Sequence, residues 1–233
     1  MTTTTFQPSR IDAIVFDVIG TLVDEDSAWA SAAARLSASA GIRDSAALHR
    51  TWAGLLEERM GAVVDGRAPW QPHRRLVVEA ARDAVTGSGG IPTPEVLAEV
   101  SLLERTYPAW PDVAEATAAL RSDRLVAGVS NGDLDSLARL SQRNAISWDV
   151  ALSTAAVQTF KPAPAAYRHA IDALDLDPGR TLFVAAHPWD LRAAAEHGFR
   201  TAYVARPGAE HPSPHDSFDL AVDDLSTLSD RLR

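Results

Sequence analysis

Apolar residues in this chain gather in short runs that turn residues separate. Helical patterns fall between the later runs, and strands that alternate with helices are typical of a parallel sheet in an α/β fold. The runs that predict strands are IDAIVFD (11–17), LVAGVS (125–130), WDVALS (148–153), TLFVAA (181–186) and TAYVAR (201–206), and SFDLAVDD (217–224) would add one more strand near the C-terminus.

The segment between the first two strands has a different pattern. It contains four stretches with apolar residues at helical spacing, joined in part by Gly- and Pro-containing loops at 65–72 and 87–90. The first stretch is alanine-rich and ends in Gly41, a residue that commonly follows the end of a helix. The stretches are SAWASAAARLSASAG (27–41), DSAALHRTWAGLLEERM (44–60), HRRLVVEAARDAV (73–85) and PEVLAEVSLLERTY (94–107). We therefore expect a helical cap over residues 24–111, inserted into an α/β core that comprises residues 1–23 and 112–233.

Composition and charge narrow the class of protein. A chain of 233 residues with 46% hydrophobic and 23% charged residues suits one large domain, or one domain with an insertion. A net charge of −9 gives no electrostatic support to a nucleic-acid or anionic-membrane partner. The chain has no cysteine, so it forms no disulfide, thiolate metal site or cysteine nucleophile. It shows no apolar leader and no run of membrane-spanning length, so we expect a soluble, cytoplasmic protein.

Four chemically capable residues lie at or just after predicted strand ends: Asp17, Ser130, Lys161 and Asp190. Taken singly, each has an ordinary explanation as a helix cap, a turn residue or a solvated surface charge. However, ligands of an open parallel sheet bind beyond the carboxyl ends of its strands. The four residues together therefore indicate one site at that edge.

The stretches around these residues resemble a known family. FDVIGTLVD (16–24), VSNG (129–132), FKP (160–162) and AAHPWD (185–190) are similar to the four motifs of the haloacid dehalogenase-like hydrolase superfamily. The resemblance covers nearly the whole chain. It implies a Rossmann-like parallel sheet core with a helical cap inserted after the first strand.

The resemblance also implies a role for each motif residue. Asp17 would be the nucleophile that forms a covalent ester or acyl phosphate with the substrate. Thr21 and Ser130 would hydrogen-bond to it or to the substrate, and Lys161 would keep it ionised. Asp190 would support the attack of water on the intermediate or, in the phosphatases of the family, bind magnesium.

Ile19 indicates which bond is broken. Phosphatases of this family usually carry a second aspartate at this position, two residues after the nucleophile, which protonates the departing alkoxide. A halide is a very weak base and leaves without a proton, and it needs only a few donors to stabilise its charge. Isoleucine cannot donate a proton, so the residue favours carbon–halogen cleavage over the hydrolysis of a phosphate ester.

Further local matches resemble the L-2-haloacid dehalogenases, the type II branch. An arginine on a cap helix contacts the substrate in that group, and ALHRTW nominates Arg50. Asn131 matches the asparagine that meets the halide, and Trp189 matches an aromatic residue that lines the halide site. Tyr167 matches the tyrosine of the KPxxxxY pattern, which supports the lysine and the last aspartate. Each of Arg50, Tyr167 and Trp189 could instead be a surface or packing residue.

The chain also departs from the group. The best-known dehalogenases have tyrosine where Ile19 stands, and they often read Ser-Ser-Asn where this chain reads Ala185-Ala186-His187. The hydroxyl of the tyrosine, the hydroxyls of the serines and the amide of the asparagine are therefore missing. His187 could replace the amide as a donor to water or product, or it could be a turn residue that never touches the substrate.

Four functions remain open on these residues. The first is hydrolysis of a short 2-haloalkanoic acid to a 2-hydroxy acid, with no cofactor and a small anionic carboxylate as substrate. The second is the opening of another carbon electrophile beside a carboxylate, such as the strained ring of azetidine-2-carboxylate. The third is a magnesium-dependent phosphatase, with Asp17, the Ile19 carbonyl and Asp190 as ligands. The fourth is a scaffold that binds a ligand without turnover. The resemblance also favours a homodimer.

Overall fold

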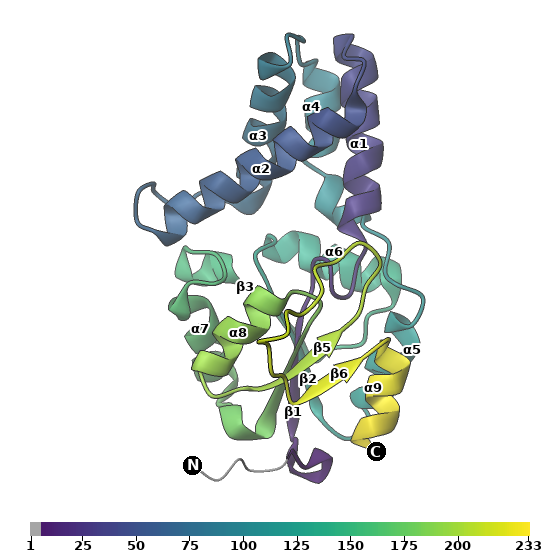
Figure 1. The fold of residues 1–233 in the computed structure, drawn as a ribbon, viewed down its shortest axis with the longest axis vertical. Helices are drawn as coiled ribbons and strands as arrows, with labels where there is room; N and C mark the ends of the chain where they lie inside the picture. Colours follow the sequence, from purple (N-terminus) through teal and green to yellow (C-terminus); the bar gives the residue numbers. More distant parts are fainter. Residues whose placement is uncertain (1–5) are drawn as a thin grey trace.

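Six strands form one sheet in which every neighbouring pair is parallel (Figure 1). The computed structural model describes residues 6–233. Along the sheet the strands follow the order β3-β2-β1-β4-β5-β6. Their bounds are β1 Ala13–Asp17, β2 Leu125–Ser130, β3 Val150–Ser153, β4 Thr181–Ala185, β5 Arg200–Val204 and β6 Leu220–Val222. Each of the six apolar runs overlaps one of these strands, and only β5 begins outside its run, at Arg200, which confirms the predicted α/β core.

Helices cover both faces of the sheet. Alternate residues of β1 point to opposite faces, so Ile14 and Phe16 join one buried cluster and Val15 joins the other. Burial on both sides explains why the strands read as continuous apolar runs. One face packs against α5 (Val113–Leu120), α6 (Leu134–Asn144) and α9 (Leu225–Leu232), and the other packs against α7 (Pro164–Leu174) and α8 (Pro188–Glu196).

The helical insertion lies above the carboxyl edge of the sheet (Figure 1). Its helices α1 to α4 follow β1 directly, as the sequence predicted, whereas α5 packs against α9 beside the sheet. The limits of the cap at residues 24 and 111 stay a prediction. Among residues 6–233, no helix combines the length and the apolar character needed to cross a membrane. The bounds are α1 Glu25–Ala40, α2 Ser45–Val64, α3 His73–Gly87 and α4 Pro94–Val100, and short 3-10 helices are η1 Pro8–Arg10, η2 Leu103–Thr106, η3 Thr154–Val157 and η4 Pro178–Arg180.

The fourth predicted cap helix ends earlier than its apolar spacing suggested. The spacing continues to residue 107, but α4 ends at Val100 and a separate 3-10 turn, η2, follows. This turn places Glu104 in a buried ion pair with His73 of α3. Pro108 then disfavours helical backbone at Tyr107, which is extended with φ −55° and ψ 128°. A long-range ion pair therefore accompanies the turn that leads the chain back to the sheet.

The two connections between cap and core lie side by side. The Asp24 backbone N–H donates to the Pro108 carbonyl at 2.8 Å, and the Trp110 N–H donates to the Leu22 carbonyl at 3.1 Å. Farther out, Arg74 of α3 donates to Asp133 at 2.8 Å, at the start of α6. These contacts hold the cap above the end of β1, so any side chain at that strand end faces the cap.

Two tryptophans form the centre of the cap. The Trp52 ring stacks on Trp29 with centroids 4.1 Å apart, which joins α2 to α1. The Trp52 indole N–H donates to the Val77 carbonyl of α3 at 2.9 Å, and the residue has 0% exposure. One side chain thus links three of the cap helices.

We expect Trp52→Ala to lower the free energy of unfolding by about 3–5 kcal/mol, because it leaves a large cavity and removes the hydrogen bond to the Val77 carbonyl. Urea unfolding measures this loss. Leu102→Ala is the matched control: Leu102 is 46% exposed, so its truncation should change stability by less than about 0.5 kcal/mol. Equal stability of the two variants would contradict the central position of Trp52.

Candidate active site

Asp17 ends the strand at which the sheet topology changes direction. β1 pairs with β2 on one side and with β4 on the other. From β1 the chain builds outward to β3, then crosses back to place β4 on the opposite side. Loops diverge at such a point and leave a crevice beyond the strand ends. Asp17 lies in that crevice and is 4% exposed.

Lys161 connects Asp17 with Asp190. The Lys161 ammonium donates to Asp17 Oδ1 at 2.6 Å and forms a second salt bridge with Asp190. The Tyr167 hydroxyl donates to the other oxygen of Asp190 at 2.5 Å. All four side chains are buried. The structure thus brings together residues from the end of β1, the loop before α7, α7 itself and the first turn of α8.

The surroundings decide the charge of this group. Burial alone would lower the pKa of Lys161, but the charges of Asp17 and Asp190 outweigh burial and raise that pKa above its usual value. Burial raises the pKa of Asp190, although Lys161 opposes the rise. Burial and the charge of Asp190 also raise the pKa of Tyr167, so its phenol stays protonated. Lys161 is therefore a permanent cation at neutral pH.

Thr21 holds the second oxygen of the nucleophile candidate. Its hydroxyl donates to Asp17 Oδ2 at 2.7 Å and accepts from the Ala186 backbone N–H at 2.9 Å. A backbone donor thus positions Thr21, and the Ala186 side chain takes no part in this contact. The first and fourth motifs meet at this hydroxyl.

His187 lies beside the same carboxylate. Its Nε2 is 3.2 Å from the Ile19 carbonyl oxygen and 3.6 Å from Asp17 Oδ2. The ring fits here because position 20 is glycine: a Cβ on Gly20 would lie 2.5 Å from His187 Nε2, and the backbone there has φ +82°. Of the two interpretations of His187, the structure favours the one that places it in the site.

The oxygens expected to hold magnesium are already engaged. His187 Nε2 contacts the Ile19 carbonyl, while Lys161 and Tyr167 occupy the two oxygens of Asp190. Within residues 6–233, no group of three or more His, Cys, Asp or Glu side chains is arranged to hold a metal ion. These residues do not fit a magnesium ion on the predicted ligand set in this conformation.

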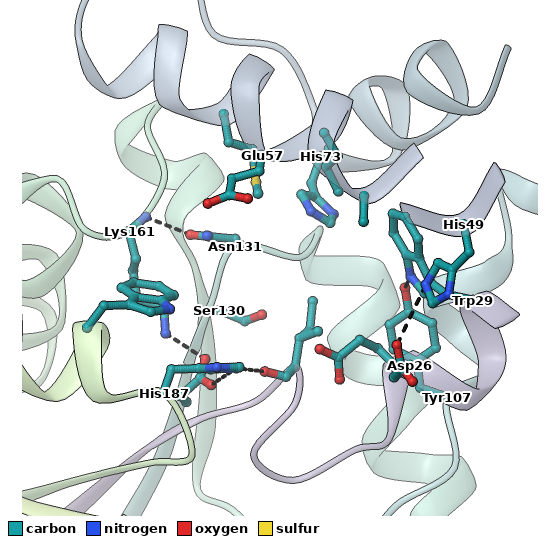
Figure 2. A pocket seen from close by; sticks show the side chains of 17 residues that line it. Asp26, Trp29, His49, Glu57, His73, Tyr107, Ser130, Asn131, Lys161 and His187 are labelled. Carbon is teal, nitrogen blue, oxygen red and sulfur yellow. Dashed lines mark hydrogen bonds and ion pairs between the residues drawn. The ribbon is translucent and has the colours of Figure 1, made fainter. Parts of the chain in front are cut away.

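A cavity of about 270 Å³ opens between the sheet edge and the cap (Figure 2). Three of the predicted residues, Thr21, Tyr167 and Asp190, do not line the cavity themselves. They hold residues of its wall in place through hydrogen bonds. The predicted residues that line the cavity are Asp17, Ile19, Ser130, Asn131, Lys161, His187 and Trp189.

Asn131 and Ser130 present donors to this cavity. The Asn131 side-chain oxygen accepts the Lys161 backbone N–H at 2.7 Å, so its amide nitrogen lies on the opposite side. Ser130 Oγ accepts the Gly132 N–H at 3.1 Å, which leaves the hydroxyl hydrogen free to donate. Trp189 stacks on the His187 ring with centroids 5.7 Å apart and lines the same side.

Arg50 does not reach the cavity. It is exposed on α2, whereas the preceding residue, His49, lines the cavity and contacts Asp26 at 3.7 Å. Successive residues of an α-helix differ by about 100° in direction, so only one of the two can face the sheet. In this conformation the structure therefore does not bring Arg50 to the cavity, contrary to the expectation that it contacts the substrate.

Sequence reasoning missed the cap residues that line the cavity. On α2 they recur at helical spacing, so the sequence marks an amphipathic helix. That spacing cannot show which face meets the cap interior and which meets the sheet. The missed residues are Glu25, Asp26, Trp29, His49, Ala53, Leu56, Glu57, Met60, His73 and Tyr107.

Glu25 is the most unusual of these residues. It follows Asp24, the N-cap residue of α1, and is the first residue of that helix, with Oε1 close to His187 and Gly20. Burial raises the pKa of Glu25 to about 7, and the charge of Asp17 adds to the rise, while its backbone hydrogen bond and His187 oppose it. Near neutral pH this carboxyl group can therefore hold or release a proton inside the cavity.

Comparisons with known proteins agree with this geometry. A family model described as haloacid dehalogenase-like hydrolase matches residues 11–198. The (S)-2-haloacid dehalogenase of Xanthobacter autotrophicus is 30% identical over 203 residues, which cover 84% of this chain and 76% of that protein. Hexitol phosphatase B of Escherichia coli (strain K12) is 26% identical over 229 residues, covering 95% and 96%. The crystal structure of the L-2-haloacid dehalogenase PA0810 superposes with a TM-score of 0.86 at 29% identity, covering 95% of this chain and 98% of that one.

We expect Lys161→Met to lower the free energy of unfolding at pH 7 by about 3–5 kcal/mol, because it leaves two buried carboxylates without a counter-charge. Urea unfolding at pH 7 and pH 5 measures the effect. The deficit should shrink at the lower pH, since an unpaired buried carboxyl group has a raised pKa and takes up a proton there. The double variant Lys161→Met, Asp190→Asn should regain part of the loss. A single variant as stable as the native protein at pH 7 would contradict the role of Lys161.

Proposed function

This chain belongs to the haloacid dehalogenase-like hydrolases, and we propose that within the family it converts short 2-haloalkanoic acids to 2-hydroxy acids. The proposal rests chiefly on one arrangement: Asp17 borders the cavity beside Lys161, while Ile19 occupies the position from which an acid would protonate an alkoxide. The resemblance to two 2-haloacid dehalogenases supports it.

In the first step, an Asp17 oxygen attacks C2 of the substrate from the side opposite the halogen. The C–O bond forms as the C–X bond breaks, and the halide leaves with the bonding electrons. The product of this step is an aspartyl ester and a free halide ion. Lys161 and Thr21 hold the carboxylate in position for this attack through contacts of 2.6 and 2.7 Å.

In the second step, water attacks the carbonyl carbon of the ester. The ester C–O bond breaks, the 2-hydroxy acid departs, and the Asp17 carboxylate is restored with release of one proton. Lys161 lies within hydrogen-bond distance of the Asp17 oxygen and can stabilise the negative charge that develops there. Asp190 and Tyr167 position Lys161 for this task.

Side chains at or just after the ends of β2 and β4 would bind the departing halide and the carboxylate of the substrate. The Ser130 hydroxyl and the Asn131 amide nitrogen face the cavity, as does the Trp189 ring. A departing halide ion takes up no proton, and hydrogen-bond donors such as these are enough to stabilise its diffuse charge. Asn131 and Trp189 would therefore form the halide site without the predicted arginine.

The similarity to a hexitol phosphatase is weaker support for phosphate hydrolysis. An alkoxide leaving group needs a proton, and Ile19 supplies none. His187 contacts the Ile19 carbonyl, and Asp190 already has two partners, so the usual magnesium ligands of such enzymes are engaged here. For both reasons we rank phosphate hydrolysis below dehalogenation as a proposed function.

One observation favours a second candidate. Glu25 lines the cavity with a pKa raised by burial to about 7, so it could protonate a leaving group that Ile19 cannot serve. A ring nitrogen next to a carboxylate, as in azetidine-2-carboxylate, is such a group. An Asp17 oxygen would form a bond to the ring carbon as the C–N bond breaks, the bonding electrons would stay on nitrogen, and the amine that is released would take the Glu25 proton.

Halide release from racemic 2-chloropropanoate tests the main proposal. In metal-free buffer with chelator, the native chain should release chloride, and Asp17→Asn should lose at least about 10³-fold in rate because it lacks the nucleophile. Ion chromatography measures the chloride. Arg50→Ala is the matched control and should keep its activity, since Arg50 lies outside the cavity. Absence of chloride with correctly folded protein would refute dehalogenation of this substrate.

The variant Glu25→Gln separates the two candidates. If Glu25 protonates the leaving group, azetidine-2-carboxylate opening should fall about 10²- to 10⁴-fold in this variant, while chloride release should change far less. Ring opening by the native chain should also weaken as the pH rises through about 7, because Glu25 then loses its proton. Mass spectrometry of the ring-opened hydroxy acid measures this. Equal loss of both reactions would count against a role in protonation.

A further inference from the structure

His73 faces the cavity from the cap. It is the first residue of α3, is 5% exposed, and forms an ion pair with Glu104 through its Nδ1 atom. Glu104 is itself only 4% exposed. In Figure 2 the His73 ring lies on the cap side of the cavity, across from Asn131 and Ser130. The pair belongs to neither the nucleophile nor the lysine network.

The ion pair leaves one edge of the His73 ring available. Nδ1–H donates to Glu104, so Nε2 is on the opposite edge of the imidazole. Among residues 6–233, Nε2 has no hydrogen-bond partner, and the atom itself is not fully buried. Since His73 lines the cavity, Nε2 is the ring atom that a ligand can reach.

The neighbours of His73 favour its charged form. Burial alone would lower the pKa of His73, but the charge and hydrogen bond of Glu104, with a contribution from Asp133, raise it above its usual value of 6.5. Burial would raise the pKa of Glu104, but His73 lowers it below its usual 4.5. Of the other charged groups nearby, Arg74 pairs with Asp133, and Glu57 lines the cavity from α2.

The cavity needs such a cation for an anionic substrate. Lys161 is already shared between Asp17 and Asp190, and the exposed Arg50 does not contribute. His49 lies near Asp26, and His187 contacts the nucleophile. His73 therefore combines a free donor, a buried carboxylate that maintains its charge, and a place opposite the donors of β2.

We propose that His73 binds the carboxylate of the substrate through Nε2–H, and that Glu104 positions and charges it. This deepens the proposed function, on which it rests, because it names the group that selects a carboxylate. The substrate would then lie between His73 and Ser130, with its C2 atom toward Asp17. The same anchor would serve any 2-substituted carboxylate that the cavity admits.

Binding of lactate, a 2-hydroxy acid that needs no turnover, tests the proposal by calorimetry. At pH 7, His73→Gln should weaken binding about 10- to 100-fold, because a charge-assisted hydrogen bond is lost. Arg50→Ala should bind lactate like the native chain. The double variant His73→Phe, Glu104→Leu removes the pair as a unit and avoids an unpaired buried charge, and it should lose binding equally. Native affinity in either His73 variant would overturn the proposal.

The pH dependence distinguishes recognition from a structural role. Binding should weaken as the pH rises through the raised pKa of His73, since the neutral ring keeps its proton on Nδ1, toward Glu104, and Nε2 then has none to donate. Glu104→Gln should move that midpoint to lower pH, because it removes the charge that raises the pKa. Glu25 also titrates in the cavity, so the native chain and Glu104→Gln are compared in a Glu25→Gln background. An unchanged midpoint would contradict the role of Glu104.

The outcome is separable from that of the proposed function. If lactate binding depends on His73 but no chloride is released from 2-chloropropanoate, dehalogenation fails and the carboxylate anchor stands. If chloride is released and His73→Gln leaves KM unchanged, the anchor fails and dehalogenation stands. A rise in KM with little change in kcat is the expected result for a residue that binds the unreacting carboxylate.

Discussion

The site depends on a buried ammonium group between two carboxylates. Asp17 and Asp190 would repel each other at this proximity, and Lys161 makes the arrangement favourable by bonding to both. Because the three residues come from a strand end, a loop and the first turn of a helix, the salt bridges also hold three separate segments of the chain together. The parallel sheet supplies the frame, since the ends of β1 and β4 lie side by side. The same salt bridges therefore set the geometry around Asp17 and stabilise this part of the protein.

The core and the cap have different tasks. The core carries Asp17, the nucleophile candidate, and the groups that hold it, and those groups are buried and mutually bonded. The cap supplies most of the cavity wall, including Glu25 and His73. Their surroundings raise both pKa values, so Glu25, an acid, is more easily neutral, and His73, a base, is more easily charged. The stacked Trp29 and Trp52 pack α1 against α2 behind this wall. The sheet thus positions the candidate catalytic group, and the helices above it shape the cavity.

Prediction from the sequence succeeded where a local pattern has one structural meaning. The apolar runs predicted the strands, and the motifs around Asp17 and Lys161 predicted residues that do meet. It could not decide whether His49 or Arg50 faces the cavity, since one residue along a helix changes the direction of a side chain by about 100°, and the structure places His49 there. It also extended the helix that ends at Val100, because apolar spacing continues through the 3-10 turn.

The sequence alone determined the α/β class and the place of the helical insertion, and it nominated Asp17 as the nucleophile candidate and marked the missing acid at Ile19, because each of these follows from residue type and order. Only the tertiary structure decided that His187 contacts the Ile19 carbonyl, that Glu25 joins the cavity, and that His73 pairs with Glu104. Those contacts join residues that are distant along the chain or lie on different elements. Their partners are set by how the cap sits on the sheet, a relation that no periodicity within a helix or strand contains.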